Sequence, residues 1–111
     1  MDTNSALNAF SALSQKTRLD VFRLLINAGP QGMSAGDIGE VLGVRQNTMS
    51  ANLSVLLQAG LIRNEREGRS IRYFADLDGT KELLTFLVAD CCGGHPELCA
   101  QVMESIACRK S

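Results

Sequence analysis

The chain has 111 residues, a formal net charge of −1, 45% hydrophobic residues and 21% charged residues. This length favours one domain over residues 1–111 with a single core, and the balanced charge does not by itself indicate a nucleic-acid partner. No apolar run approaches the length of a transmembrane helix, and the start Met-Asp-Thr-Asn is not typical of a signal peptide. We therefore expect a cytoplasmic protein with no membrane partner.

Apolar residues at helical spacing predict three helices in the first part of the chain, over residues 5–13, 15–28 and 34–42. The first has Leu7, Phe10 and Leu13 on one face, and Ser14 can cap the second. Ser34 is a typical capping residue for the third. The predicted core face of the second helix is Leu19, Phe22, Leu25 and Ile26.

A tight turn leads from the third helix to a fourth predicted helix over residues 46–59. Only Val44 and Arg45 follow Gly43 before the helical pattern resumes, so the two helices must meet at a sharp angle. The predicted buried stripe is Met49, Leu53, Leu56 and Leu57. The opposite face carries Gln46, Asn47, Ser50, Ala51 and Ser54, with Asn52 at its flank. Short amides and hydroxyls can read base edges in a major groove, although a solvated amphipathic helix also has a polar face.

A basic hairpin follows this helix. Two strands are predicted over residues 61–66 and 70–75, on either side of Glu67-Gly68-Arg69. The hairpin carries four arginines within ten residues against two glutamates, and the arginines are Arg63, Arg66, Arg69 and Arg72. A basic ribbon directly after a helix-turn-helix favours a wing that contacts phosphates or a minor groove.

The last part of the chain is again predicted to be helical, beginning after a cap at Asp78. Leu83, Leu84, Phe86, Leu87 and Val88 are too many apolar residues for one narrow stripe. A helix that is apolar over so much of its circumference needs more cover than a small domain offers, so we expect it to contact a partner subunit. Another helix is expected over residues 96–108, after a break at Gly93-Gly94.

Three of the four cysteines and the only histidine lie within residues 91–99. Thiolates at Cys91, Cys92 and Cys99 are soft donors that suit a thiophilic ion. In a reducing cytosol, such a cluster is more often a metal or redox site than a disulfide framework. Packing as small core residues is the alternative, but neighbours on a helix point about 100° apart, so Cys91 and Cys92 cannot both occupy one apolar stripe.

In combination, four stretches resemble the ArsR/SmtB family of dimeric winged-helix repressors, over roughly residues 7–90. They are Ala12-Leu13-Ser14-Gln15-Lys16-Thr17-Arg18-Leu19, Gln46-Asn47-Thr48-Met49-Ser50-Ala51-Asn52-Leu53-Ser54-Val55-Leu56, Ala59-Gly60-Leu61-Ile62 and Gly68-Arg69-Ser70-Ile71-Arg72-Tyr73. The resemblance implies a mainly α fold with a small β-hairpin, a winged helix-turn-helix that dimerises through its N- and C-terminal helices. It implies a homodimer that binds double-stranded operator DNA, with no cofactor required, and not an enzyme.

By resemblance, the helix that begins at Gln46 is the recognition helix, and positions 46, 48, 50 and 52 match DNA-contacting positions of the family. Arg45 departs from the family, which usually has a serine cap at this point. With the polar helix face and the hairpin included, the candidate DNA-binding residues are Arg45, Gln46, Asn47, Thr48, Ser50, Ala51, Asn52, Arg66, Arg69 and Arg72.

The expected sensor is the C-terminal segment, residues 88–108. The helix over residues 34–42 lacks the cysteine motif of the best-known arsenic sensors of the family, and the acid and histidine zinc pattern is not evident on the last helices. Cys91, Cys92 and Cys99 resemble instead the site of arsenic-responsive members with C-terminal cysteines. This implies repression that is relieved by trivalent arsenic (arsenite) or antimonite.

Other ligands of the same cysteines stay open. Zinc, cadmium or lead could bind there, with His95 as a fourth ligand to zinc, or the thiols could act as an oxidation switch. His95 stands directly before Pro96, where capping or solvent exposure is the simpler expectation. Cys108 is expected to pack.

Overall fold

The computed structural model describes residues 1–89 and residue 101. The predicted helix over residues 96–108 and the candidate ligands Cys91, Cys92 and Cys99 lie outside the described residues. The elements, in chain order, are α1 (Thr3–Leu13), α2 (Lys16–Ala28), a short 3-10 helix η1 (Gly29–Gln31), β1 (Met33–Ser34), α3 (Ala35–Leu42), α4 (Gln46–Gln58), β2 (Ile62–Glu67), β3 (Ser70–Ala75) and α5 (Leu77–Ala89).

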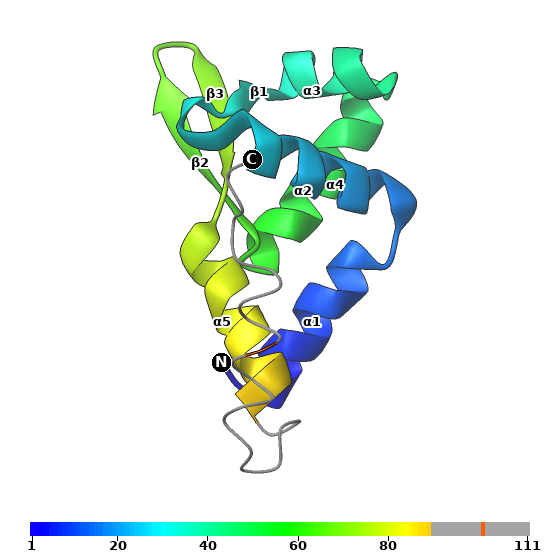
Figure 1. The fold of residues 1–111 in the computed structure, drawn as a ribbon. Coiled ribbons are helices and arrows are strands. Elements are labelled where there is room, and N and C mark those ends of the chain that lie inside the picture. Colours follow the sequence, from blue (N-terminus) through cyan, green and yellow to red (C-terminus); the bar gives the residue numbers. More distant parts are fainter. Residues whose placement is uncertain (90–100, 102–111) are drawn as a thin grey trace.

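The described part of the chain forms a winged helix-turn-helix (Figure 1). The β2–β3 hairpin and α3 lie at one end, shown at the top of the picture, and α1 and α5 lie side by side at the other end. The predicted fold class, mainly α with a small hairpin, is confirmed. No helix in the described residues is long and apolar enough to cross a membrane.

The sheet has one strand more than the sequence predicted. Its order is β1-β3-β2, all antiparallel, and β1 pairs Met33 with Tyr73. Two residues are too few to show the alternation that identifies a strand, so β1 depends on its partner. Gly32 allows the approach: its φ is +63°, and a Cβ at this position would lie 2.5 Å from the Tyr73 carbonyl oxygen.

The core of the described residues is formed by one face of each helix and the base of the hairpin. Its largest buried members are Val21, Leu25, Ile38, Met49, Leu53, Leu56 and Leu61. On α1, Ala6, Ala9 and Ala12 face the core, while Leu7 and Phe10 of the predicted apolar face are exposed. On α2, Leu19 and Ile26 are likewise exposed. Small alanines let α1 approach its neighbours closely, which leaves the larger apolar side chains outside.

Two predicted helix caps are also corrected. The N-cap of α2 is Gln15, whose side chain accepts from the Arg18 N–H, while the Ser14 hydroxyl donates to the Ser11 carbonyl at the end of α1. At the start of α5, Asp76 rather than Asp78 accepts from the Gly79 N–H, at 3.0 Å. Helix α2 therefore begins one residue later than predicted, and α5 begins two residues earlier.

Helices α1 and α3 begin at side chains that are typical N-caps, an aspartate and a serine. The Ser34 cap of α3 is confirmed by its bond from the Asp37 N–H, at 3.1 Å. Asp2 caps α1, and the Ser5 N–H that it accepts lowers the pKa of this carboxyl below its usual value.

Candidate nucleic-acid interface

The turn between α3 and α4 is closed by glycine. Gly43 ends α3 in the left-handed conformation, with φ +69°, and the Val44 N–H donates to the Gly39 carbonyl at 2.9 Å. A Cβ on Gly39 would lie 2.9 Å from the Val44 carbonyl oxygen, so a larger residue would force the two helices apart. The predicted tight turn is present, and α4 is held firmly against α3.

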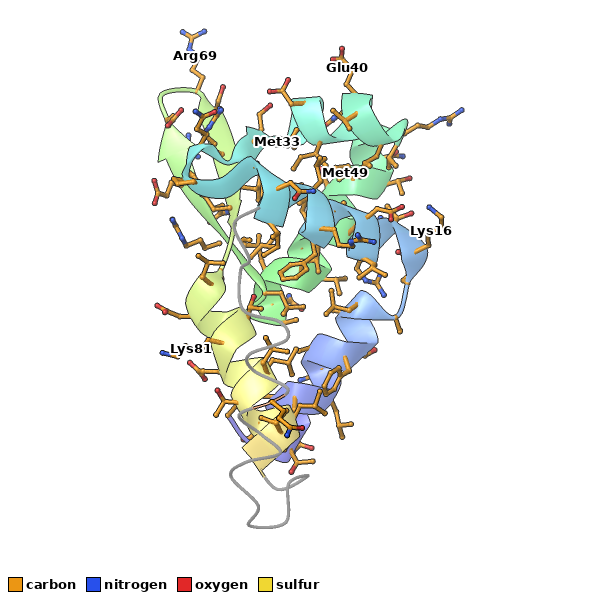
Figure 2. All side chains as sticks on the ribbon, in the orientation of Figure 1. Lys16, Met33, Glu40, Met49, Arg69 and Lys81 are labelled. Carbon is orange, nitrogen blue, oxygen red and sulfur yellow. The ribbon has the colours of Figure 1, made fainter. Side chains whose placement is uncertain are left out.

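The side of α4 that faces away from the core carries most of the predicted contact residues. Met49, Leu53 and Leu56 are buried. The exposed side chains are Gln46, Asn47, Thr48, Ser50 and Ala51, followed by Ser54. Figure 2 shows Met49 pointing into the space between the helices, which places the polar face on the outside of the helix-turn-helix.

The first turn of α4 receives no cap from Arg45, and one of its backbone N–H groups, that of Thr48, is already bonded. Arg45 is the N-cap, its side chain makes no capping bond, and it is exposed. The Thr48 N–H is bonded to the Asn47 side chain, and the Gln46 amide donates to the Ala35 carbonyl at 3.3 Å. Backbone N–H groups at a helix start, with a cation beside them, are suited to a phosphate.

Asn52 is placed differently from the expectation. Its side chain is 6% exposed, and its amide oxygen accepts a hydrogen bond from Arg18 on α2, at 3.2 Å. It therefore belongs to the packed side of α4 rather than to the outer face, and we leave it out of the DNA-contacting set. The spacing of Met49, Asn52, Leu53 and Leu56 is that of an inward helix face, a signal that the sequence already carried.

The four arginines of the hairpin fall into two pairs. Arg63 donates to Glu65 at 2.5 Å, and its guanidinium lies 4.4 Å from the Phe74 ring centroid. Arg72 donates to the Gln31 carbonyl, also at 2.5 Å, which attaches β3 to η1. These two arginines are occupied within the fold.

Arg66 and Arg69 have no partner among the described residues. The strand register places Arg66, opposite Ile71, on the other face of the hairpin from Arg63 and Arg72. Figure 2 shows Arg69 projecting from the hairpin tip, away from the body of the protein. Both are exposed, so they are the hairpin arginines best placed for a phosphate backbone.

The described residues contain no group of three or more His, Cys, Asp or Glu side chains that could hold a metal ion. Within the described residues, the side chains suited to binding a ligand gather on the outer face of α4 and on the basic hairpin. The fold and this face define a winged helix-turn-helix protein of the DNA-binding class.

Comparison with known proteins agrees with this class. A helix-turn-helix domain model matches residues 13–65. A Halobacterium salinarum protein that carries the provisional name of arsenical resistance operon repressor is 36% identical over 89 residues, covering 80% of this chain and 72% of that protein. The transcriptional repressor SdpR of Bacillus subtilis is 36% identical over 66 residues, covering 60% of this chain and 70% of that protein.

Solved structures share the fold. An ArsR-like transcriptional regulator from Rhodococcus matches with a TM-score of 0.73 at 24% identity, covering 93% of each chain. A homodimeric winged helix-turn-helix DNA-binding domain from Mycobacterium bovis matches with a TM-score of 0.63 at 29% identity, covering 83% of this chain and 86% of that one. The chain belongs to the ArsR/SmtB family of winged helix-turn-helix transcriptional regulators, which are DNA-binding proteins and not enzymes.

Proposed function

We propose that this protein is a homodimeric repressor that leaves its operator when trivalent arsenic or antimony binds Cys91, Cys92 and Cys99. The observation that carries the proposal is the position of these cysteines in the sequence. Cys91 and Cys92 come just after α5, which contacts α1, and Cys99 follows seven residues later. The name of the Halobacterium relative, which refers to arsenical resistance, agrees with this ligand class.

Exposed apolar side chains on α1 and α5 support the homodimer. Leu7 is 58% exposed and Phe10 38% on α1, and Leu87 is 44% exposed on α5. The two helices contact each other at the end away from the hairpin tip. Large apolar side chains on contacting helices are typical of a subunit interface, and the Mycobacterium relative is homodimeric.

In the proposed complex, the outer face of α4 enters the major groove. Gln46, Ser50 and Ala51 then meet base edges, and Arg45 with the start of α4 meets a phosphate. Arg66 and Arg69 hold the flanking backbone. Two such units related by a two-fold axis would read half-sites about 34 Å apart, one turn of the double helix.

The chemistry of the proposed sensor suits a three-coordinate thiophilic ion. Arsenite, as As(OH)₃, would exchange its three hydroxyl groups for three cysteine thiolates. Each hydroxyl leaves as water with one thiol proton, and no electron is transferred. The lone pair of arsenic occupies the fourth direction, so no fourth ligand is needed. Zinc would instead take four ligands in a tetrahedron, and His95 could complete such a set with the three cysteines.

Release follows from negative coupling between the two sites. A ligand that draws Cys91, Cys92 and Cys99 together changes the segment that continues α5, and α5 packs on α1. If that arrangement differs from the DNA-bound one, binding of the ion and of DNA oppose each other, typically by about 1–3 kcal/mol. A change of this size would lower operator affinity by about 5- to 150-fold.

A mobility-shift assay on the DNA upstream of the protein's own gene tests the proposal. Under reducing conditions, the protein should retard this DNA, and arsenite or antimonite should release it at concentrations where zinc and hydrogen peroxide do not. Release by zinc or peroxide alone would replace the arsenic assignment with one of the alternatives. Absence of any retarded complex would contradict the repressor proposal itself.

A further inference from the structure

Arg18 joins three helices through one guanidinium group. It belongs to α2, its Nε donates to the Ala12 carbonyl in the last turn of α1 at 2.8 Å, and its Nη1 donates to the Asn52 side chain of α4 at 3.2 Å. Its backbone N–H is itself fixed by the Gln15 cap at 2.9 Å. The planar fork of arginine suits this role because it can donate in two directions while staying rigid.

The contact is unusual within the described residues. Asn52 is the one polar side chain in their core, and the Arg18–Asn52 bond is the one hydrogen bond among them between two side chains of different helices. The other side-chain pairs, Lys16 with Asp20 and Arg63 with Glu65, lie within a single element. No buried polar side-chain atom of the described residues lacks a partner.

A buried polar contact of this kind restricts the orientation of a helix more than it adds to the stability of the fold. Met49, Leu53 and Leu56 hold α4 by apolar packing, which is proportional to area and tolerates small rotations of the helix. A hydrogen bond loses strength steeply when its geometry changes, and an unpartnered buried amide is costly. The Arg18 fork therefore selects one rotation of α4 relative to the end of α1.

We propose that Arg18 and Asn52 are positioning residues that fix the recognition helix relative to the dimerisation helix and so set the half-site spacing that the dimer accepts. This inference rests on the proposed homodimer and operator binding. Neither side chain touches DNA in this role. Asn52, which the sequence pattern places at the edge of the reading face, acts through the orientation of α4.

Operator spacing supplies a readout that a general loss of stability would not change. The wild-type protein first selects its preferred duplexes from a random-sequence pool. The selected duplex is then compared with versions that have one base pair inserted or removed at the centre, which rotates one half-site by about 35° relative to the other. The ratio of the affinities for native and altered spacing is measured by fluorescence anisotropy.

Two variants remove the contact. Asn52→Leu replaces the acceptor with an apolar side chain of similar size. Arg18→Lys keeps the charge but replaces the planar fork, whose two nitrogens make the two bonds, with a single ammonium nitrogen. Both should bind the selected duplex about tenfold more weakly, within the range known for residues that transmit coupling without touching a ligand. Their spacing ratio should fall toward one, while far-UV circular dichroism and dimer mass stay those of the wild type.

Two further variants serve as controls. Asn52→Asp keeps an acceptor for Arg18 and should keep the wild-type spacing ratio, even if its added charge weakens all DNA binding equally. Arg23→Lys makes the same substitution at an exposed arginine of α2 and should change nothing.

The possible results separate this inference from the proposed function. An unchanged spacing ratio in folded Asn52→Leu and Arg18→Lys would overturn the positioning role and leave the repressor proposal standing. Equal weakening on every spacing would show a role in stability alone and would overturn it as well. If the wild-type protein selected no duplex, both proposals would fall together.

Discussion

Arg66 and Arg69 differ from Arg63 in what surrounds them, and this difference should appear in the salt dependence of DNA binding. Arg66→Gln and Arg69→Gln should each make the slope of log affinity against log salt concentration shallower by about one, because each removes one phosphate contact. Arg63→Gln removes the same charge from the other face of the hairpin, where Glu65 and Phe74 engage it. Equal slopes for Arg63→Gln and Arg66→Gln would contradict this division of the hairpin.

Gly29 and Gly32 allow a test of the backbone around η1. Both have positive φ, +65° and +63°, but a Cβ on Gly29 meets nothing within 4 Å, whereas one on Gly32 meets Tyr73 and Phe74. Gly29→Ala should lower the free energy of unfolding by about 1–3 kcal/mol through backbone strain alone. Gly32→Ala adds overlap with β3 and should cost about 1–3 kcal/mol more. Urea denaturation measures both, and equal values would contradict the close packing of Gly32 on β3.

Helix α1 has two apolar faces, one of alanines packed on the core and one of larger side chains exposed to the outside. Its sequence places Leu7, Phe10 and Leu13 on one face, and the structure turns the alanine face to the core instead. Apolar periodicity reports that a face is covered, but not whether the same chain or a partner covers it. The three-residue spacing therefore identified an apolar face but not the neighbour that would cover it.

The exposed apolar face of α1 leads to a prediction about the oligomeric state. Leu7→Lys should shift the protein from dimer to monomer in sedimentation velocity, because it places a charge in the proposed subunit interface. Val41→Lys is the matched control, since Val41 on α3 is 61% exposed, close to the 58% of Leu7, and lies away from α1 and α5. A dimer that survives Leu7→Lys would place the interface elsewhere.

Much of the remaining architecture followed from local chemistry. Gly43, the Ser34 cap and the turn at residues 67–69 placed the ends of α3, the start of α4 and the hairpin closely. The strand β1 was missed because two residues carry no periodicity, and the role of Asn52 was missed because its partner, Arg18, is 34 positions away. Contacts between distant residues are fixed by packing, which a single sequence does not display.

In the whole molecule, the proposed mechanism connects the DNA-reading end to the proposed sensor segment through α1 and α5. The outer face of α4 could be predicted from composition, because it consists of short uncharged side chains where a merely solvated helix would carry charges. The three-cysteine site remains a prediction from sequence. In the proposed mechanism, a change at this site reaches α1 through α5, which contacts it, and reaches α4 through the Arg18–Asn52 contact.

The most direct test of the central claim is a titration of arsenite into the protein bound to fluorescent operator DNA under reducing conditions. Wild-type protein and Cys108→Ser should release the DNA with the same midpoint. Cys91→Ser, Cys92→Ser and Cys99→Ser should each bind the operator as tightly as the wild type but fail to release it. If all three of these variants still released the DNA on addition of arsenite, the three-cysteine sensor would be contradicted.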